Sequence, residues 1–255
     1  MIESVHTLAA LRRHIASLDG VPAQDNAAVR AAIGHGGIDR ALGGGLARGR
    51  MHELFGVTEE DGAAAGFALL LSRLLGGAAP LLWLRTVAAD RAGGHAYGPG
   101  LAALGFDPDR LLIALMADDR MLLRGAVDAL RCPALGALLI EVRGRAPLLD
   151  LTASRRLALA AERSGVTALL LRIGADPVPS AADTRWRIGS APSRPLPGNA
   201  PGMSAFDLSL LKQRAGPDGL CWRLVWNNAA GCFEEDRDAR DDAGHPASGL
   251  HAVRP

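Results

Sequence analysis

The chain has 255 residues, of which 49% are hydrophobic and 22% charged, a composition typical of globular proteins that bury a sizeable core. The formal net charge of +1 excludes a strongly basic surface that would hold nucleic acid non-specifically. No apolar run reaches the ~18 residues that a membrane span needs, and the N-terminal residues lack the pattern of a signal peptide, so we expect a cytoplasmic protein.

The N-terminal region, residues 1–32, is predicted to form a helix followed by a linker. Its apolar residues, Leu8, Leu11 and Ile15 among them, recur at helical spacing and form one face. This face packs on the chain's own core, on a neighbouring subunit or in the groove of another partner, and the sequence leaves these alternatives open.

Strands and helices alternate through the core, residues 33–190, after a glycine-rich stretch at 33–50 that favours turns. The predicted strands are 51–55, 80–84, 111–115, 137–142, 167–173 and 184–190, and the predicted helices are 63–75, 101–104, 119–130 and 151–164. Near-continuous apolar strands between amphipathic helices predict an α/β fold with a mainly parallel sheet flanked by helices. The last strand alternates polar and apolar residues, which is typical of a half-exposed edge strand.

Residues 191–233 are predicted to form a linker and a small C-terminal β unit. The segment 191–202 is rich in proline and is predicted to form neither a helix nor a central strand. Apolar and polar residues alternate in 220–226, which predicts a two-faced strand that carries Trp222 and Trp226. The last residues, 234–255, have almost nothing to bury and are predicted to be disordered.

The segment from Gly56 to Ala64 has the outline of a phosphate-binding loop between a strand and a helix. A working loop reads G-x-x-x-x-G-K-[ST], in which the lysine reaches the terminal phosphates and the hydroxyl holds magnesium. Here five residues separate Gly56 from Gly62, one more than in the motif, and Ala63 and Ala64 replace the lysine and the hydroxyl. The loop is degenerate, and we expect no cofactor in it.

Three acids inside this loop, Glu59, Glu60 and Asp61, would repel a triphosphate. They suit the positive end of the following helix, and Asp61 is expected to cap it. Binding of a nucleotide by an unusual route is the alternative. The only lysine of the chain, Lys212, would have to serve any activity that requires one.

Other candidate site residues are few. Glu141, near the end of the predicted strand 137–142, could hold magnesium as the strand-tip acid of a parallel-sheet ATPase does, or could be incidental there. We expect His35, His52 and His95, which are isolated in the sequence, to be structural or solvated. The scattered residues Cys132, Cys221 and Cys232 predict neither a metal site nor a disulfide framework, and no catalytic constellation emerges.

The order of these segments resembles a known family. The stretch "IDRALGGGLARGRMHELFG", residues 38–56, is similar to the segment that leads into the phosphate loop of bacterial RecA recombinases, and the later strands follow in the RecA order. The segments "AADTRWRIGSAPS", 181–193, and "FDLSLLKQRAGPDGLCWRLVW", 206–226, resemble the ImuA family. The resemblance covers roughly residues 1–233 and depends on linear order more than on any single motif.

The resemblance to ImuA implies a RecA-like core that has lost its ATP site. It also implies an accessory role in SOS-induced translesion synthesis, together with ImuB, a Y-family-like protein without polymerase activity, and an error-prone replicative-type polymerase. Two alternatives stay open. One is an ATPase with a divergent loop that uses Glu141 and an arginine, and the other is a modulator of RecA filaments.

Recombinases hold DNA with two loops that follow their third and fourth core strands, and the corresponding segments here are 143–151 and 174–183. Arg143 and Arg145 in the first segment either contact a phosphate or are solvated surface arginines. The second segment has two acids and no basic residue, which makes it a poor phosphate ligand. Trp222 and Trp226 either anchor a partner or fill the core of the β unit.

Overall fold

The computed structural model describes residues 29–58, 62–200 and 202–236 of the chain. The predictions for the N-terminal helix with Leu8, Leu11 and Ile15, for Glu59, Glu60 and Asp61, and for the tail beyond residue 236 lie outside these ranges.

A nine-stranded sheet runs through the described residues in the order β11-β10-β9-β8-β3-β7-β6-β4-β5. Its strands are β3 (Met51–Gly56), β4 (Leu81–Thr86), β5 (Leu111–Met116), β6 (Ala137–Arg143), β7 (Thr167–Ile173), β8 (Thr184–Ser190), β9 (Ala205–Gln213), β10 (Cys221–Asn227) and β11 (Cys232–Glu235). All pairings from β8 across to β5 are parallel, and those among β8, β9, β10 and β11 are antiparallel. The mainly parallel sheet predicted from the apolar strands is confirmed.

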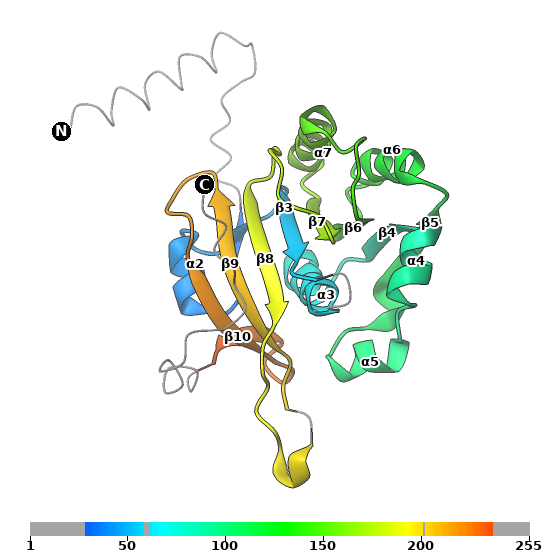
Figure 1. Ribbon diagram of the computed structural model, residues 1–255. Helices are drawn as coiled ribbons and strands as arrows, with labels where there is room; N and C mark the ends of the chain where they lie inside the picture. The colour runs from blue at the N-terminus through cyan, green and yellow to red at the C-terminus, as the bar shows by residue number, and fades with distance from the viewer. Residues whose placement is uncertain (1–28, 59–61, 201, 237–255) are drawn as a thin grey trace, which may run out of the picture.

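Helices cover both faces of the parallel strands (Figure 1). The helices are α2 (Gly36–Ala41), α3 (Ala63–Gly76), α4 (Val87–Gly93), α5 (Gly98–Ala103), α6 (Asp119–Ala129) and α7 (Leu151–Ser164), with short 3₁₀ turns η1 (Pro108–Arg110) and η2 (Pro197–Asn199). Helix α3 packs in one hydrophobic cluster with β6, β7 and β8, and α6 and α7 pack in a second cluster on the other face. A separate two-stranded ladder joins β1 (Arg30–Ala31) to β2 (Leu46–Ala47).

The two longest surface helices begin and end where their sequences predict. Asp118 and Asp150 accept hydrogen bonds from the backbone N–H groups three residues later and so cap α6 and α7. Helix α7 ends at Gly165, whose φ of 77° is in the left-handed region that glycine adopts without strain. Two short helices were not predicted. They are α2, in the glycine-rich stretch, and α4, whose small residues give no clear apolar stripe.

The prediction that residues 184–190 form an edge strand is wrong. Strand β8 lies inside the sheet, parallel to β3 on one side and antiparallel to β9 on the other. Its alternation has a different cause. Thr184, Trp186 and Ile188 are buried in the α3 cluster or beside it, while Arg185 and Arg187 lie on the opposite face, which is only partly covered.

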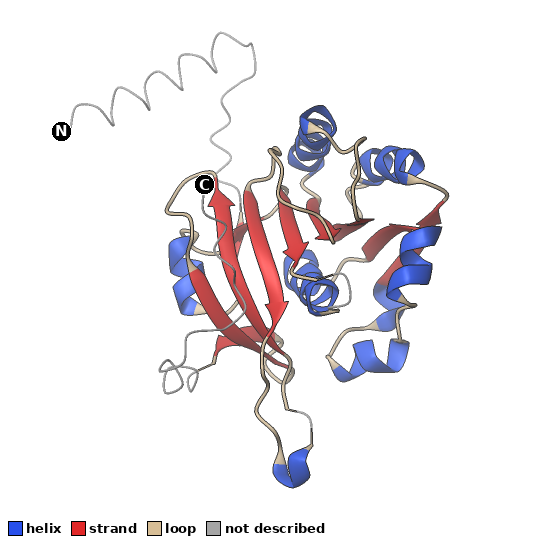
Figure 2. Cartoon of the chain, in the orientation of Figure 1, coloured by secondary structure: helices blue, strands red, loops and turns tan. Residues whose placement is uncertain are grey.

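The C-terminal strands are present but form no separate core. Strands β9, β10 and β11 extend the sheet beyond β8, and their inward side chains pack on α3. The ring centroids of Phe67 of α3 and Phe233 of β11 lie 4.9 Å apart, and Trp226 of β10 is equally close to Phe233. The proline-rich connection between β8 and β9 contains η2 and projects away from the sheet (Figure 2). Among the described residues, no helix is long and apolar enough to cross a membrane.

Candidate functional site

The start of α3 is built from small apolar groups. Gly62, which has no side chain, occupies the N-cap position, and the prediction that Asp61 caps the helix lies outside the described residues. The Ala64 methyl group is fully buried beside Gly56 and Ile173. The position that would carry the metal-binding hydroxyl of a phosphate loop is therefore part of the hydrophobic core.

Lys212 is far along the sheet from this loop. It lies on β9, opposite Arg185 of β8, and Arg185 is opposite Glu53 in the first half of β3. Helix α3 follows the other end of β3, where Gly56 pairs with Ile188. The sheet register thus places the chain's only lysine toward the amino end of β3, and the loop begins at the carboxyl end.

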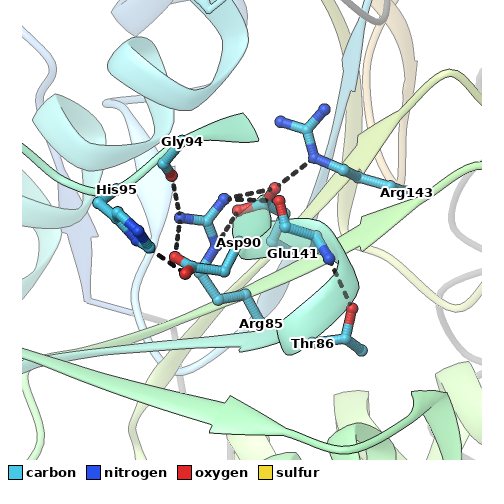
Figure 3. A network of polar contacts seen from close by, with 8 residues as sticks. Arg85, Thr86, Asp90, Gly94, His95, Glu141 and Arg143 are labelled. Carbon is cyan, nitrogen blue, oxygen red and sulfur yellow. Dashed lines mark hydrogen bonds and ion pairs between the residues drawn. The ribbon is translucent and has the colours of Figure 1, made fainter. Parts of the chain in front are cut away.

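A buried carboxylate lies at the carboxyl ends of β4 and β6, on the face covered by α3 (Figure 3). Glu141 of β6 is 1% exposed, and two guanidinium groups contact it. Nη2 of Arg85 is 3.2 Å from Oε1, its Nε is 3.1 Å from Oε2, and Nε of Arg143 donates to Oε1 at 2.7 Å. Both oxygens of Glu141 therefore face arginine.

Arg85 joins this carboxylate to a second acid, Asp90 of α4, as Figure 3 shows. Nη1 of Arg85 donates to Oδ1 of Asp90 at 3.0 Å and to the carbonyl oxygen of Gly94 at 2.8 Å. Oδ2 of Asp90 is 2.8 Å from Nδ1 of His95, a side chain that is 83% exposed. The charge network of Arg85, Asp90, Glu141 and Arg143 thus reaches solvent through His95.

Two further features hold these guanidinium groups in place. The guanidinium carbon of Arg85 is 4.5 Å from the centre of the Trp83 ring, a cation–π contact on the same strand. Gly93 has no side chain, and a Cβ there would collide with the guanidinium of Arg143. Since a buried charge is costly unless it is paired, the network accounts for how Arg85 and Glu141 are tolerated inside the fold.

A second buried carboxylate, Glu53, lies on the opposite face of the sheet. Oε2 of Glu53 accepts from Nε of Arg185 at 3.0 Å and from Oγ of Ser180 at 2.7 Å. Nη2 of Arg185 donates to the carbonyl oxygen of Val178 at 2.6 Å. Burial lowers the pKa of Arg172, and the nearby Glu53 carboxylate opposes that shift. These contacts fasten the segment 174–183 to β3 and β8.

The histidines have the structural or solvated roles predicted for them. His52 is fully buried, and its ring nitrogens are 2.8 Å from Oγ1 of Thr184 and 2.8 Å from the carbonyl oxygen of Ala47. Because Nε1 of Trp186 donates to the same Thr184 oxygen, the neutral ring satisfies the whole chain of hydrogen bonds. Burial lowers the pKa of His52. His35 caps α2, and His95 is largely solvated.

The structure separates residues that the sequence grouped together. Arg143 is turned inward to Glu141 rather than solvated, whereas Arg145 is exposed, and its contact with DNA stays a prediction. Trp226 is 1% exposed and donates from Nε1 to the carbonyl oxygen of Leu104, so its prediction as a partner anchor is wrong. Trp222 is half-buried beside Trp186.

Sequence reasoning missed the partners of Glu141. Arg85 is 56 residues away in the chain, and only the adjacency of β4 and β6 brings the two together. A signal was nevertheless present, because Glu53, Arg85 and Arg172 are charges inside or directly after apolar strands and must be paired. The cysteines are free thiols, and the described residues contain no cluster of histidine, cysteine or acidic side chains suited to a metal ion.

Comparison with known proteins identifies relatives at two levels. No family model matches the chain. The ImuA proteins of two strains of Caulobacter vibrioides are each 36% identical to it over 170 residues, a match that covers 61% of this chain and 66% of the relative. The match thus spans just under two thirds of the length of these curated relatives.

A solved structure shows the same fold. The RadB recombinase superposes with a TM-score of 0.52 at 14% sequence identity, covering 80% of this chain and 99% of the recombinase. At this identity the likeness concerns the fold alone. The sequence match makes the chain a homologue of these ImuA proteins over the matched residues, and the superposition shows a RecA-like fold.

Proposed function

We propose that this protein is a non-catalytic RecA-like accessory protein of an SOS-induced translesion synthesis complex. In this role it acts with an ImuB-like polymerase homologue and an error-prone replicative-type polymerase, and it needs no nucleotide. The observation that carries the proposal is the pairing of Glu141, the only candidate for a strand-tip magnesium acid, with two arginines inside the fold.

The residues at the nucleotide position of a RecA-like fold do not fit magnesium and ATP. A magnesium ion is a small cation that takes oxygen ligands, and two guanidinium groups already lie against Glu141: Nε of Arg143 donates to Oε1, and Nε of Arg85 is 3.1 Å from Oε2 without forming a hydrogen bond. The next donor of a phosphate loop would be a hydroxyl, and that position is the buried methyl of Ala64. Neither the metal nor its bridging hydroxyl has a place in this donor set.

No nearby arginine substitutes for the missing lysine. Arg85 is 1% exposed and makes its contacts with Glu141, Asp90 and the backbone of α4. Arg143 is nearer to solvent, but its guanidinium lies against Gly93 and Glu141. A terminal phosphate would have to break these ion pairs before either arginine could reach it, which opposes the alternative of a divergent ATPase.

A scaffold must offer surfaces to partners, and exposed apolar side chains gather at two places in the described residues. One is the free sheet edge at β5, where Leu112, Ile113 and Leu115 are about half exposed. The other is the surface of α6 and α7, which includes Leu159. Exposed apolar groups of this kind mark interaction sites in soluble proteins. The N-terminal segment with Leu8, Leu11 and Ile15 is a further proposed partner element.

The test is a pull-down at low salt of a purified ImuB-like protein by this chain. We expect a stable complex that forms equally with and without Mg-ATP. The matched control is Glu141→Gln, which should bind equally if the charge network is structural. Failure of the wild-type chain to retain the ImuB-like protein would contradict the proposal.

A further inference from the structure

The surface of α6 and α7 has a groove whose occupant the proposed function does not identify. The two helices pack side by side over β4, β6 and β7 (Figure 1). Two hollows of about 440 and 490 Å³ follow their junction, and both are lined by Val127 of α6 and Arg156 of α7. Because they share these residues, the two hollows adjoin each other, and we call them together the α6–α7 groove.

Apolar side chains form the floor of the α6–α7 groove. Leu123 and Val127 of α6 and Leu157 of α7 line it, and Leu159 lies at its far end with 52% of its surface exposed. In α6, Arg120, Leu123, Arg124 and Val127 fall on one helical face at the i, i+3, i+4, i+7 spacing. The groove runs along helices of 11 and 14 residues, or roughly 16 to 21 Å at 1.5 Å per residue.

The rim of the groove is strongly positive. Five arginines line the two hollows, and the lining residues include one acid, Asp128, which is paired with Arg131. The arginines are Arg120, Arg124, Arg131, Arg156 and Arg163. Five positive charges less one negative charge leave a net of four on this small surface, whereas the whole chain has a net charge of +1.

Apart from Asp128, the acids of the same helices and of their caps are used elsewhere. Asp118 and Asp150 cap the two helices, and Glu162 of α7 pairs with Arg50, which precedes β3. Asp119 interacts electrostatically with Arg172 in the interior. The sequence thus places its acids at helix ends and toward the core, and its arginines around the apolar groove.

We propose that the α6–α7 groove binds an acidic amphipathic helix of a partner protein. Its floor offers room for apolar residues at helical spacing, and its rim offers arginines, the cation most favoured at protein interfaces, to carboxylates on both sides. A groove of this length takes about three turns of helix. The apolar floor favours a peptide over nucleic acid, which would need phosphate contacts along the whole surface. This inference goes beyond the proposed function, which notes exposed apolar residues on α6 and α7 but specifies neither a groove nor the kind of ligand that it binds.

The probe is a fluorescein-labelled synthetic peptide of about four helical turns, with leucines at i, i+3, i+4 and i+7 and glutamates at the flanking positions. Fluorescence anisotropy with the full chain measures its affinity. Two control peptides keep the length: one replaces the glutamates by lysine, and the other replaces the leucines by serine. We expect the acidic amphipathic peptide to bind at least about tenfold more tightly than either control.

Two neighbouring arginines on α7 provide a matched pair of variants. Arg156 lines both hollows, whereas Arg155 lines neither, and both side chains are exposed. Arg156→Glu should weaken peptide binding about tenfold, and Arg155→Glu should change it less than about twofold. Leu159→Asp should also weaken binding, because it places a charge at the apolar end of the groove. Unchanged thermal unfolding of each variant shows that the fold is intact.

Several results would overturn the inference. One is equal affinity of the chain for the three peptides. Another is an equal loss of peptide affinity in Arg155→Glu and Arg156→Glu. A third is a labelled single-stranded oligonucleotide that binds the chain more tightly than the peptide does and whose binding is lost in Arg156→Glu. A dimer in sedimentation that Arg156→Glu converts to a monomer would assign the groove to a second copy of the chain. The peptide titration contains no ImuB-like protein. A negative titration therefore contradicts only this inference, and a negative pull-down of the ImuB-like protein contradicts only the proposed function.

Discussion

Arginines cluster in two regions of this protein, and the two regions use them in opposite ways. At the carboxyl ends of β4 and β6, Arg85 and Arg143 face the buried carboxylate of Glu141. In the α6–α7 groove, arginines surround an apolar floor, and the acids of the same helices other than Asp128 are engaged elsewhere. One region has its charges balanced internally, and the other has an excess that faces outward.

The difference distinguishes charges that are paired inside the fold from charges that face solvent. A charge network closed on itself stabilises the fold only while all members are present, because a buried charge without its partner is costly. An exposed set of like charges contributes little to the free energy of unfolding and is available for a binding partner. Substitutions in the two regions should therefore separate stability from binding.

The largest expected effect is that of Glu141→Ala. This substitution leaves the guanidinium of Arg85, 2% exposed, without its main counter-charge, and we expect a loss of about 3–5 kcal/mol in the free energy of unfolding. Urea denaturation followed by circular dichroism measures it. The control is Asp128→Ala, which removes an ion pair whose side chains are 71% and 73% exposed and should cost less than about 0.5 kcal/mol. Equal costs for the two variants would contradict the comparison.

A smaller loss is expected from Arg143→Ala. Glu141 keeps Arg85 in this variant, and the Arg143 side chain is already 23% exposed, so we expect a cost of about 1–2 kcal/mol. Arg143→Lys should recover part of it if charge matters more than the geometry of the guanidinium. The same urea titration measures both variants, and a cost above that of Glu141→Ala would show that Arg143, not Arg85, is the main partner.

The comparison can be sharpened with a buried polar group that has no ion-pair partner. Burial lowers the pKa of His52 below its ordinary value of 6.5, so at mildly acidic pH the unfolded chain binds a proton that the folded chain does not. The stabilisation is therefore present above pH 6.5 and is lost as the pH falls below it. Unfolding free energies measured across this range should fall more steeply for the wild-type chain than for His52→Gln, and parallel pH profiles would rule out this role.

The smallest effect on stability is expected in the α6–α7 groove. Arg156 is exposed, so Arg156→Glu should change the free energy of unfolding by less than about 0.5 kcal/mol. The same variant should lose peptide affinity, as proposed above. A large loss of stability in thermal or urea unfolding would show that this arginine is part of the fold rather than of a binding surface.

Apolar runs and caps allowed much of this fold to be predicted from the sequence. Residues 151–164 and 167–173 match α7 and β7 because caps and continuous apolar residues mark their ends. The place of β8 was predicted incorrectly, since alternation reports one covered face and not the number of strand neighbours. The missing lysine and hydroxyl at Ala63 and Ala64 were visible in the sequence. The pairing of Arg85 with Glu141 was not, because it depends on strand order.

Isothermal titration of the wild-type chain with Mg-ATP tests the central claim most directly, with Ala63→Lys titrated in parallel. If Glu141 is held by Arg85 and Arg143 and the place of the hydroxyl is a core methyl, neither protein should show binding, since a lysine alone supplies no metal ligand. Micromolar binding by the wild-type chain that Glu141→Gln abolishes would contradict this account and would identify Glu141 as a magnesium ligand.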